Sequence, residues 1–250
     1  MEISQLSDTV VLLRMDTGKA NAISPEFLNA LGLALDAFEG SASPALVITG
    51  SERFFSAGLD LVSLIEFDAS QLKAHMQRFD DIVSRLFLLG RPVIAAVNGH
   101  AIAGGCVLAM TADVRVGAAG KWRMGMNETT LGLGLPVAAL VPSQFALPTS
   151  AFARALLAGE LFAPDDARQL GLLDELVPAE ELIEQAQARA EALAKIPLSA
   201  FADTKRRLRE PTLQAARAAS PRDLDSWVDV WFEPVTQARL KAAVAALRKR

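Results

Sequence analysis

The stretch PVIAAVNGHAIAGGCVLAM, residues 92–110, decides the fold expected for this chain. Residues 92–97 are apolar and partly β-branched, which predicts a buried strand. Asn98-Gly99 is a turn signal, and Gly104-Gly105 precedes a short apolar helix over residues 106–110. A strand followed by a turn and a helix is the repeating unit of α/β folds.

The same alternation continues on both sides of this stretch. Apolar, partly β-branched runs predict strands over residues 9–15, 45–49 and 114–116. Apolar residues spaced by three or four predict helices over residues 25–39 and 71–89. We therefore expect an α/β fold with mainly parallel strand pairing.

Beyond residue 136, periodic apolar segments predict helix almost throughout, with separate helices over 198–209 and from 212 onward. The Ile196-Pro197 step suggests a division between an acyl-CoA-binding core over residues 1–196 and a helical trimerisation region over 197–250. Three aromatic residues in this region leave two interpretations open, a self-association surface or a helix packed back on its own core. They are Trp227, Trp231 and Phe232.

The composition excludes several classes of protein. The 250 residues are 51% hydrophobic and 22% charged, which allows a large core. A net charge of −4 argues against nucleic acid as a partner. Cys106 is the single cysteine and the two histidines lie far apart, so we expect no disulfide and no metal site. The N-terminus lacks a signal-peptide pattern and no apolar run reaches about 18 residues, so we expect a cytoplasmic protein without membrane contact.

Three segments carry residues suited to an anion and a proton. Residues 54–60 (FFSAGLD) and 98–106 (NGHAIAGGC) place small residues before a helix, which leaves backbone N–H groups free for an anionic oxygen. Residues 125–132 (GMNETTLG) place Glu128 in apolar surroundings, where burial would raise its pKa and make it a base near neutral pH. Taken singly, the segments are also consistent with a tight turn, close helix packing and a surface glutamate.

Together these segments resemble the enoyl-CoA hydratase/isomerase family, the crotonase superfamily. Residues 56–61 (SAGLDL) and 98–106 resemble its two oxyanion-hole segments. Residues 112–116 (ADVRV), 163–167 (APDDA) and 171–178 (GLLDELVP) match further segments typical of the family. The resemblance extends from about Thr9 to the C-terminus. It implies an α/β crotonase-like fold, a spiral of ββα units with a C-terminal helical region.

The resemblance also implies roles for individual residues. The amides of Leu59 and Gly104 would hold the thioester oxygen of an acyl-CoA, and Glu128 would act as base and acid. Further residues would line the acyl-CoA site: Ala57, Gly58, Asp60, Leu61, Asn127, and, near the CoA moiety, Lys19, Ala20 and Ala22. Lys205 and Arg206 are weaker candidates for phosphate contacts. The resemblance implies a homotrimer or a dimer of trimers and no cofactor, because coenzyme A is part of the substrate.

Two positions distinguish among the reactions of the family. Its hydratases activate water with two glutamates, and here Val107 stands where the second is expected. The apolar residue after Ala-Gly-Gly-Cys and the Asn127-Glu128-Thr129 sequence are similar to mitochondrial-type short-chain 3,2-enoyl-CoA isomerases. We therefore expect an isomerase of fatty acid degradation that works through a dienolate. The alternatives are hydration, thioester hydrolysis, or acyl-CoA binding without turnover.

Four other polar side chains have simpler interpretations. We expect His75 to be a helix residue without a catalytic role and His100 to be a structural or rim residue. Cys106 is expected to be a small packing residue. Asp60 is expected to cap or orient its loop.

Overall fold

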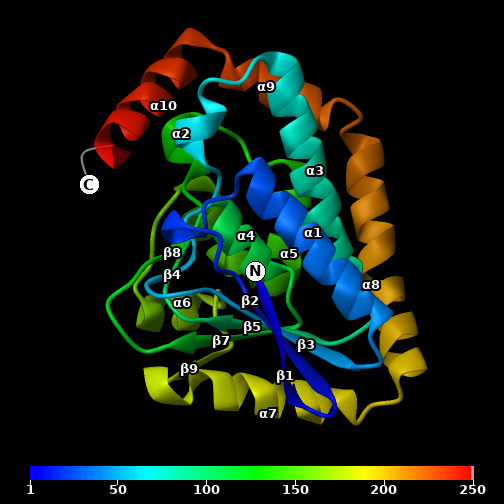
Figure 1. Cartoon of the computed structure of the whole chain (residues 1–250). Coiled ribbons are helices and arrows are strands. Elements are labelled where there is room, and N and C mark those ends of the chain that lie inside the picture. Colours follow the sequence, from blue (N-terminus) through cyan, green and yellow to red (C-terminus); the bar gives the residue numbers. More distant parts are fainter. Residues whose placement is uncertain (249–250) are drawn as a thin grey trace.

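A six-stranded sheet crosses the lower half of the molecule in the view of Figure 1. The computed structural model describes residues 1–248, without the side chain of Lys19. β1 runs antiparallel to β2, and all other neighbours in this sheet are parallel, which confirms the expected mainly parallel pairing. The strands in spatial order are β1 (Glu2–Ser7), β2 (Val10–Arg14), β3 (Ala45–Thr49), β5 (Val93–Val97), β7 (Val114–Ala118) and β9 (Glu175–Val177).

A second, three-stranded parallel sheet consists of β4 (Phe54–Ser56), β6 (His100–Ile102) and β8 (Met124–Gly125). In the chain, β4 follows β3, β6 follows β5 and β8 follows β7. Each unit therefore gives one strand to each sheet before its helical segment, which is the expected spiral of ββα units. Strands this short carry no periodicity, so the sequence pattern did not predict the small sheet.

Helices cover both faces of the large sheet. α7 (Leu182–Ala194) lies on one face, where its buried residues pack against alternate residues of β2, β3, β5 and β7. The other residues of these strands face the main core beneath α1 (Pro25–Gly40), α3 (Ala69–Leu88), α4 (Gly104–Met110) and α5 (Val137–Ala146) (Figure 1). Strands buried on both faces read as continuous apolar runs, which is why their segments were predictable. α2 (Leu61–Leu64) and α6 (Pro164–Leu170) complete this part of the fold.

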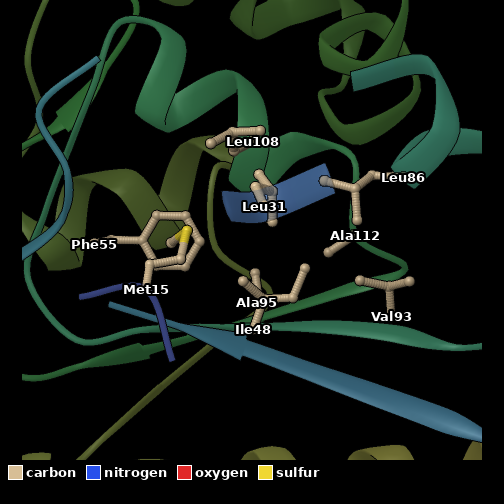
Figure 2. A pocket seen from close by; sticks show the side chains of 9 residues that line it. All are labelled: Met15, Leu31, Ile48, Phe55, Leu86, Val93, Ala95, Leu108 and Ala112. Atoms are coloured by element: carbon tan, nitrogen blue, oxygen red, sulfur yellow. The ribbon is translucent and has the colours of Figure 1, made fainter. Parts of the chain in front are cut away.

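The main core contains a small apolar cavity of about 10 Å³ between the sheet and the helices (Figure 2). Such a volume would hold at most about one water, and a water needs polar partners that this lining does not offer. The cavity is therefore a packing defect of the core and not a substrate site. Its lining residues are Met15, Leu31, Ile48, Phe55, Leu86, Val93, Ala95, Leu108 and Ala112.

The C-terminal part forms α8 (Leu198–Ala219), α9 (Asp223–Trp231) and α10 (Pro234–Leu247). α8 continues through Pro211, so the break expected between residues 209 and 212 is wrong. Proline removes one N–H bond to the preceding turn, but burial of Leu213 keeps the second half of α8 on the core. Residues 175–177 form β9, a strand that the sequence pattern did not predict. The predicted division at residue 196 falls between α7 and α8 and stays a prediction.

The two tryptophans of α9 are buried in the same core as the main fold. Trp227 is 6% exposed and donates from Nε1 to the carbonyl of Gly134 at 3.0 Å, and Trp231 is fully buried. This decides between the two interpretations of these tryptophans in favour of a helix packed back on its own core. Phe232 is 40% exposed. Within residues 1–248, no helix has the length and apolar character needed to cross a membrane.

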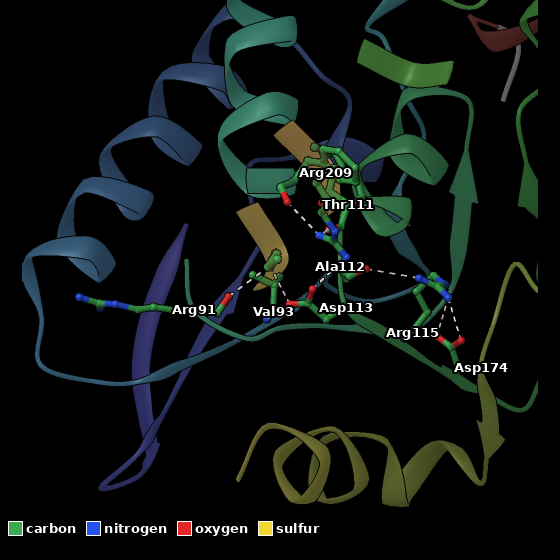
Figure 3. Close-up of polar contacts among 11 residues, drawn as sticks. Arg91, Val93, Thr111, Ala112, Asp113, Arg115, Asp174 and Arg209 are labelled. Atoms are coloured by element: carbon green, nitrogen blue, oxygen red, sulfur yellow. Dashed lines mark hydrogen bonds and ion pairs between the residues drawn. The ribbon is translucent and has the colours of Figure 1, made fainter. Parts of the chain in front are cut away.

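A buried ion-pair cluster fastens α8 to the large sheet. Asp113 accepts a hydrogen bond from the backbone N–H of Val93 at 2.8 Å and pairs with Arg209 at 2.9 Å (Figure 3). It also accepts from Lys205 Nζ at 2.8 Å. Burial lowers the pKa of Lys205 to about 8, with Asp113 opposing the shift. The Lys205 ammonium is thus buried and paired, so the expected phosphate contact from this residue is wrong. Arg206 is exposed, and its role stays a prediction.

Candidate active site

The carboxyl ends of the small sheet bring the three candidate segments together. β4 leads into residues 57–60, β6 into residues 103–105 and β8 into residues 126–128. Because the strands are parallel neighbours, these three continuations leave the same edge of the sheet. Ligands of parallel sheets typically bind at this edge. The three segments, which are far apart in the sequence, therefore form one candidate site.

The Leu59 amide is oriented by a bridge between Leu59 and Ile23. Ile23 donates to the carbonyl of Gly58 at 2.8 Å, and its own carbonyl accepts from Asp60 N–H at 3.3 Å. In a parallel pair, a residue bonds to the backbone groups that flank the residue opposite it. Ile23 thus uses the Gly58 carbonyl and the Asp60 N–H, and the N–H of Leu59 between them faces away from Ile23. Among residues 1–248 this amide has no hydrogen-bond acceptor, which leaves it free for a ligand.

The Gly104 amide lies beside it. Gly104 is the first residue of α4, so its N–H has no acceptor within the helix. The preceding Ala103 has φ 51° and ψ −126°, a conformation that costs a residue with a side chain about 1–3 kcal/mol. Hydrogen bonds to Gly125 and from Val107 hold Ala103 in place. A Cβ added at Gly58 would lie 3.1 Å from the Gly104 nitrogen, so the two candidate amides belong to touching backbone segments.

Glu128 is the buried carboxylate of the site. It begins the short 3-10 helix η2 (Glu128–Leu131), is 9% exposed, and its Oε2 has no hydrogen-bond partner among the described residues. Burial raises the pKa of Glu128 to about 7, opposed only by its own backbone N–H. A carboxyl group with such a pKa can both take and return a proton near neutral pH.

The surroundings of Glu128 on α4 are apolar. Val107 is fully buried, and Cys106 beside it is buried as well. The pKa of the Cys106 thiol is raised by burial and by the Glu128 carboxylate, which makes the thiol unreactive and shows that the carboxylate lies near α4. No charged side chain of the described residues contributes to the pKa shift of Glu128. The raised pKa of Glu128 therefore comes from burial rather than from interaction with a second carboxylate.

The other candidate residues of the first segment lie around the Leu59 amide. Asp60 caps α2 by accepting from Ser63, which confirms the expected capping role. Leu61 is the half-buried first residue of α2. Ala57 and Gly58 form the turn that leads from β4 to Leu59. Contact of these four residues with a substrate stays a prediction.

The early segment over residues 19–22 lies alongside this turn. The carbonyl of Ala20 accepts from the N–H of Ala57 at 2.9 Å, and the carbonyl of Ala22 accepts from the N–H of Ser24. The side chain of Lys19 lies outside the described residues. In the third segment, the carbonyl of Asn127 accepts from the N–H of Thr130 at 3.1 Å. The roles of these residues toward a substrate stay predictions.

Asn21 supports the site and was not singled out from the sequence. It is fully buried, and its amide donates to the carbonyls of Met15 at 2.8 Å and Phe55 at 3.2 Å. The backbone carbonyl of Asn21 accepts from Ser56 Oγ at 2.7 Å. Asn21 therefore ties β2 and β4 to the segment that borders the site. An asparagine in a polar stretch has the sequence signal of an ordinary turn, so only the structure identifies this role.

His100 lies at the opposite, amino end of the small sheet. Its Nδ1 accepts from the N–H of Arg123 at 3.1 Å, and its ring lies against Phe54 with centroids 5.0 Å apart. This position agrees with the expected structural or rim role.

Known proteins with similar sequences and folds identify the family. The enoyl-CoA hydratase/isomerase family model matches residues 5–241. The human mitochondrial enoyl-CoA delta isomerase 1 is 32% identical over 219 residues, which cover 86% of this chain and 72% of the relative. The Escherichia coli 2,3-dehydroadipyl-CoA hydratase is 32% identical over 214 residues, which cover 84% and 83%. The crystal structure of human mitochondrial delta3-delta2-enoyl-CoA isomerase matches with a TM-score of 0.91 at 27% identity, covering 96% of this chain and 94% of that one.

The chain therefore belongs to the enoyl-CoA hydratase/isomerase family and has the crotonase fold. The family implies an enzyme that acts on acyl-CoA in fatty acid metabolism. An isomerase and a hydratase are equally identical to this chain, so overall similarity does not select between the two reactions.

Proposed function

We propose that this enzyme is an enoyl-CoA isomerase of fatty acid degradation, which moves the double bond of a 3-enoyl-CoA to position 2. The observation that carries the proposal is the lone buried carboxylate of Glu128 beside α4, where the fully buried Val107 occupies the position of the second glutamate of hydratases. One base is sufficient to move a proton from one carbon to another. The apolar Val107 favours this proton transfer over activation of water by a pair of carboxylates.

In the proposed reaction, Glu128 removes a proton from C2 of the bound 3-enoyl-CoA. The electron pair shifts to give a dienolate with its negative charge on the thioester oxygen, and the amides of Leu59 and Gly104 donate to that oxygen. The protonated Glu128 then returns the proton to C4, which completes the conjugated 2-enoyl-CoA. The apolar Val107 helps to exclude water from the intermediate. The scheme uses no cofactor, because coenzyme A is part of the substrate.

Product analysis tests the reaction class. A short 3-enoyl-CoA should be converted to its conjugated 2-enoyl-CoA, followed by absorbance. A hydroxyacyl-CoA as the main product would instead indicate hydration, and release of free coenzyme A would indicate thioester hydrolysis. Tight binding without any product would indicate an acyl-CoA-binding protein.

The rate should depend on pH through Glu128. The base must be ionised in the free enzyme, and burial raises the pKa of Glu128 to about 7. We therefore expect kcat/KM for a 3-enoyl-CoA to rise with pH and level off above about 7, with a value at pH 6 about tenfold below the plateau. A profile that stays flat down to pH 5 would contradict the assignment of Glu128 as the base.

Gly58→Ala should lower kcat, because the added methyl group displaces the backbone near the amides of Leu59 and Gly104. Gly58 has φ 83°, and an added Cβ would lie 2.7 Å from the Ile102 carbonyl oxygen and 3.1 Å from the Gly104 nitrogen. The backbone must shift, and loss of one oxyanion donor typically costs about 10²–10³ in kcat. The control is Gly40→Ala, because an added Cβ there meets no atom within 4 Å. Equal kcat values for the two variants would argue against these amides as the oxyanion hole.

We also propose a homotrimer, or a dimer of trimers, that assembles through the C-terminal helical region, and a cytoplasmic location. Exposed apolar side chains support the assembly, since Leu208 is 60% and Val235 is 67% exposed. Sedimentation that finds only monomers at micromolar concentration would rule the assembly out.

A further inference from the structure

His75 is a buried histidine that the proposed reaction does not use. Its side chain is 5% exposed, and its Nε2 has no hydrogen-bond partner among the described residues. Buried polar atoms are nearly always paired, since an unpaired one is unfavourable. Nε2 of His75 therefore offers a hydrogen-bonding position that a group of a bound ligand can fill.

α3 carries His75 past the candidate active site. Phe79 lies four residues further along, on the same face of α3. A Cβ added at Gly104 would lie 3.3 Å from Cζ of Phe79, so this face of α3 packs against the Cα of Gly104. His75 is about 6 Å from Phe79 along the helix axis. Its ring meets that of Phe67 edge-on, with centroids 6.2 Å apart.

The groups around His75 determine which partner fits. Burial lowers the pKa of His75, while the carbonyl of Ile23 and the carboxylates of Asp60 and Glu26 oppose this shift. The imidazole is therefore neutral near pH 7, and Nε2 donates or accepts according to the tautomer. The two carboxylates disfavour an anionic partner. A hydroxyl group both donates and accepts, so it fits either tautomer without adding charge.

We propose that His75 is a specificity-determining residue that binds a hydroxyl group on the acyl chain, a few carbon atoms from the thioester. The inference rests on the proposed function, because that function places the thioester at the amides of Leu59 and Gly104. A hydroxylated chain satisfies Nε2, whereas a plain chain leaves this nitrogen buried and unpaired. Sites that hydrogen-bond a substrate hydroxyl discriminate against analogues that lack it.

Calorimetric binding of unreactive saturated ligands tests the proposal. The ligands are free coenzyme A, hexanoyl-CoA, hexanoyl-CoA with a hydroxyl at carbon 5 or 6, and adipoyl-CoA. The wild type should bind one hydroxylated chain about threefold to tenfold more tightly than hexanoyl-CoA. Adipoyl-CoA, which carries a carboxylate, should gain nothing. His75→Leu should abolish the preference while hexanoyl-CoA binding is kept, and His75→Gln should restore part of it.

The outcomes separate the proposal from its alternatives. If the wild type shows no preference, Nε2 is satisfied by water and the proposal is overturned. If His75→Leu weakens binding of free coenzyme A and of all acyl-CoA ligands equally, His75 serves the CoA moiety or the fold, which also overturns it. His100→Leu is the control, because His100 lies at the other edge of the small sheet. If His75→Leu does not fold, the wild-type preference and His75→Gln decide.

Because binding is measured, the specificity and the reaction are tested separately. A preference for the hydroxylated chain in a protein that produces no 2-enoyl-CoA would refute the isomerase and keep the role of His75. Turnover of 3-enoyl-CoA by a protein that shows no preference for the hydroxylated chain would support the isomerase and refute the role of His75.

Discussion

Replacement of Glu128 by glutamine is expected to lower the turnover of a short 3-enoyl-CoA by about 10²–10⁴, the usual effect of losing a general base. Glutamine keeps the size of the side chain and its hydrogen-bonding oxygen, but it cannot carry the proton from C2 to C4. The amides of Leu59 and Gly104 remain in place, so acyl-CoA should still bind. The measurement is the absorbance of the conjugated product, with wild type and variant side by side.

Stability distinguishes a lost base from a damaged fold. The pKa of Glu128 is about 7 in the folded protein, above its ordinary value of 4.5. The folded state therefore holds this proton more tightly, and the resulting stability is present below pH 4.5 and is lost as the pH rises through about 7. At pH 8 the buried carboxylate costs about 3 kcal/mol, a cost that glutamine avoids. Glu128→Gln should thus be much less active and yet more stable than the wild type at pH 8.

The control is Glu181→Gln, which changes an exposed glutamate of the 3-10 helix before α7. It should leave turnover unchanged, and it should not stabilise the protein at pH 8, because a negative charge at the start of α7 is favourable. If Glu128→Gln keeps wild-type turnover, or if both proteins are inert while substrate binds, Glu128 is not the base of this reaction. Another crotonase-type reaction or a binding role would then be favoured.

Asp113→Asn is expected to lower the free energy of unfolding by about 3–5 kcal/mol, because it leaves buried cations without their partner. Lys205 is 5% exposed, and the side chain of Arg209 is 13% exposed. Asparagine keeps an oxygen for the Val93 N–H but carries no charge. Denaturant titration at fixed protomer concentration measures the loss, since stability of an oligomer depends on concentration.

Two comparisons test the cause. Asp203→Asn removes an exposed partner of Arg206 and Arg207 on the same helix, and it should leave the free energy of unfolding almost unchanged. Adding Lys205→Met to Asp113→Asn should recover part of the lost stability, since it removes one of the unpaired buried charges. If Asp113→Asn costs no more than Asp203→Asn, the cluster does not hold α8 to the sheet.

The sequence predicted the parts of the fold whose residues are buried over long apolar runs. β2, β3, β5 and β7 lie between two layers of helix, so nearly every residue is apolar and the signal is strong. β1 was missed because it is a largely exposed edge strand with a polar sequence. β4, β6 and β8 were missed because two or three residues show no periodicity. Pro211 was read as a break because tertiary packing, rather than local propensity, continues α8.

The residue types of the candidate site were also predictable from the sequence. The glycine-containing segments around Leu59 and Gly104, and a glutamate in apolar surroundings, are local features, and the resemblance to the family joined them. The absence of a second glutamate at Val107 is a sequence fact as well.

Only the tertiary structure decided how these parts act together. The parallel pairing of the small sheet brings three distant segments to one edge, and the strained turn at Ala103 sets the Gly104 amide beside Gly58. Burial from all sides, which no local pattern encodes, raises the pKa of Glu128 to about 7 and leaves Nε2 of His75 without a partner. Sequence specifies which groups are present, whereas long-range packing determines their solvation and mutual geometry, and these determine the chemistry.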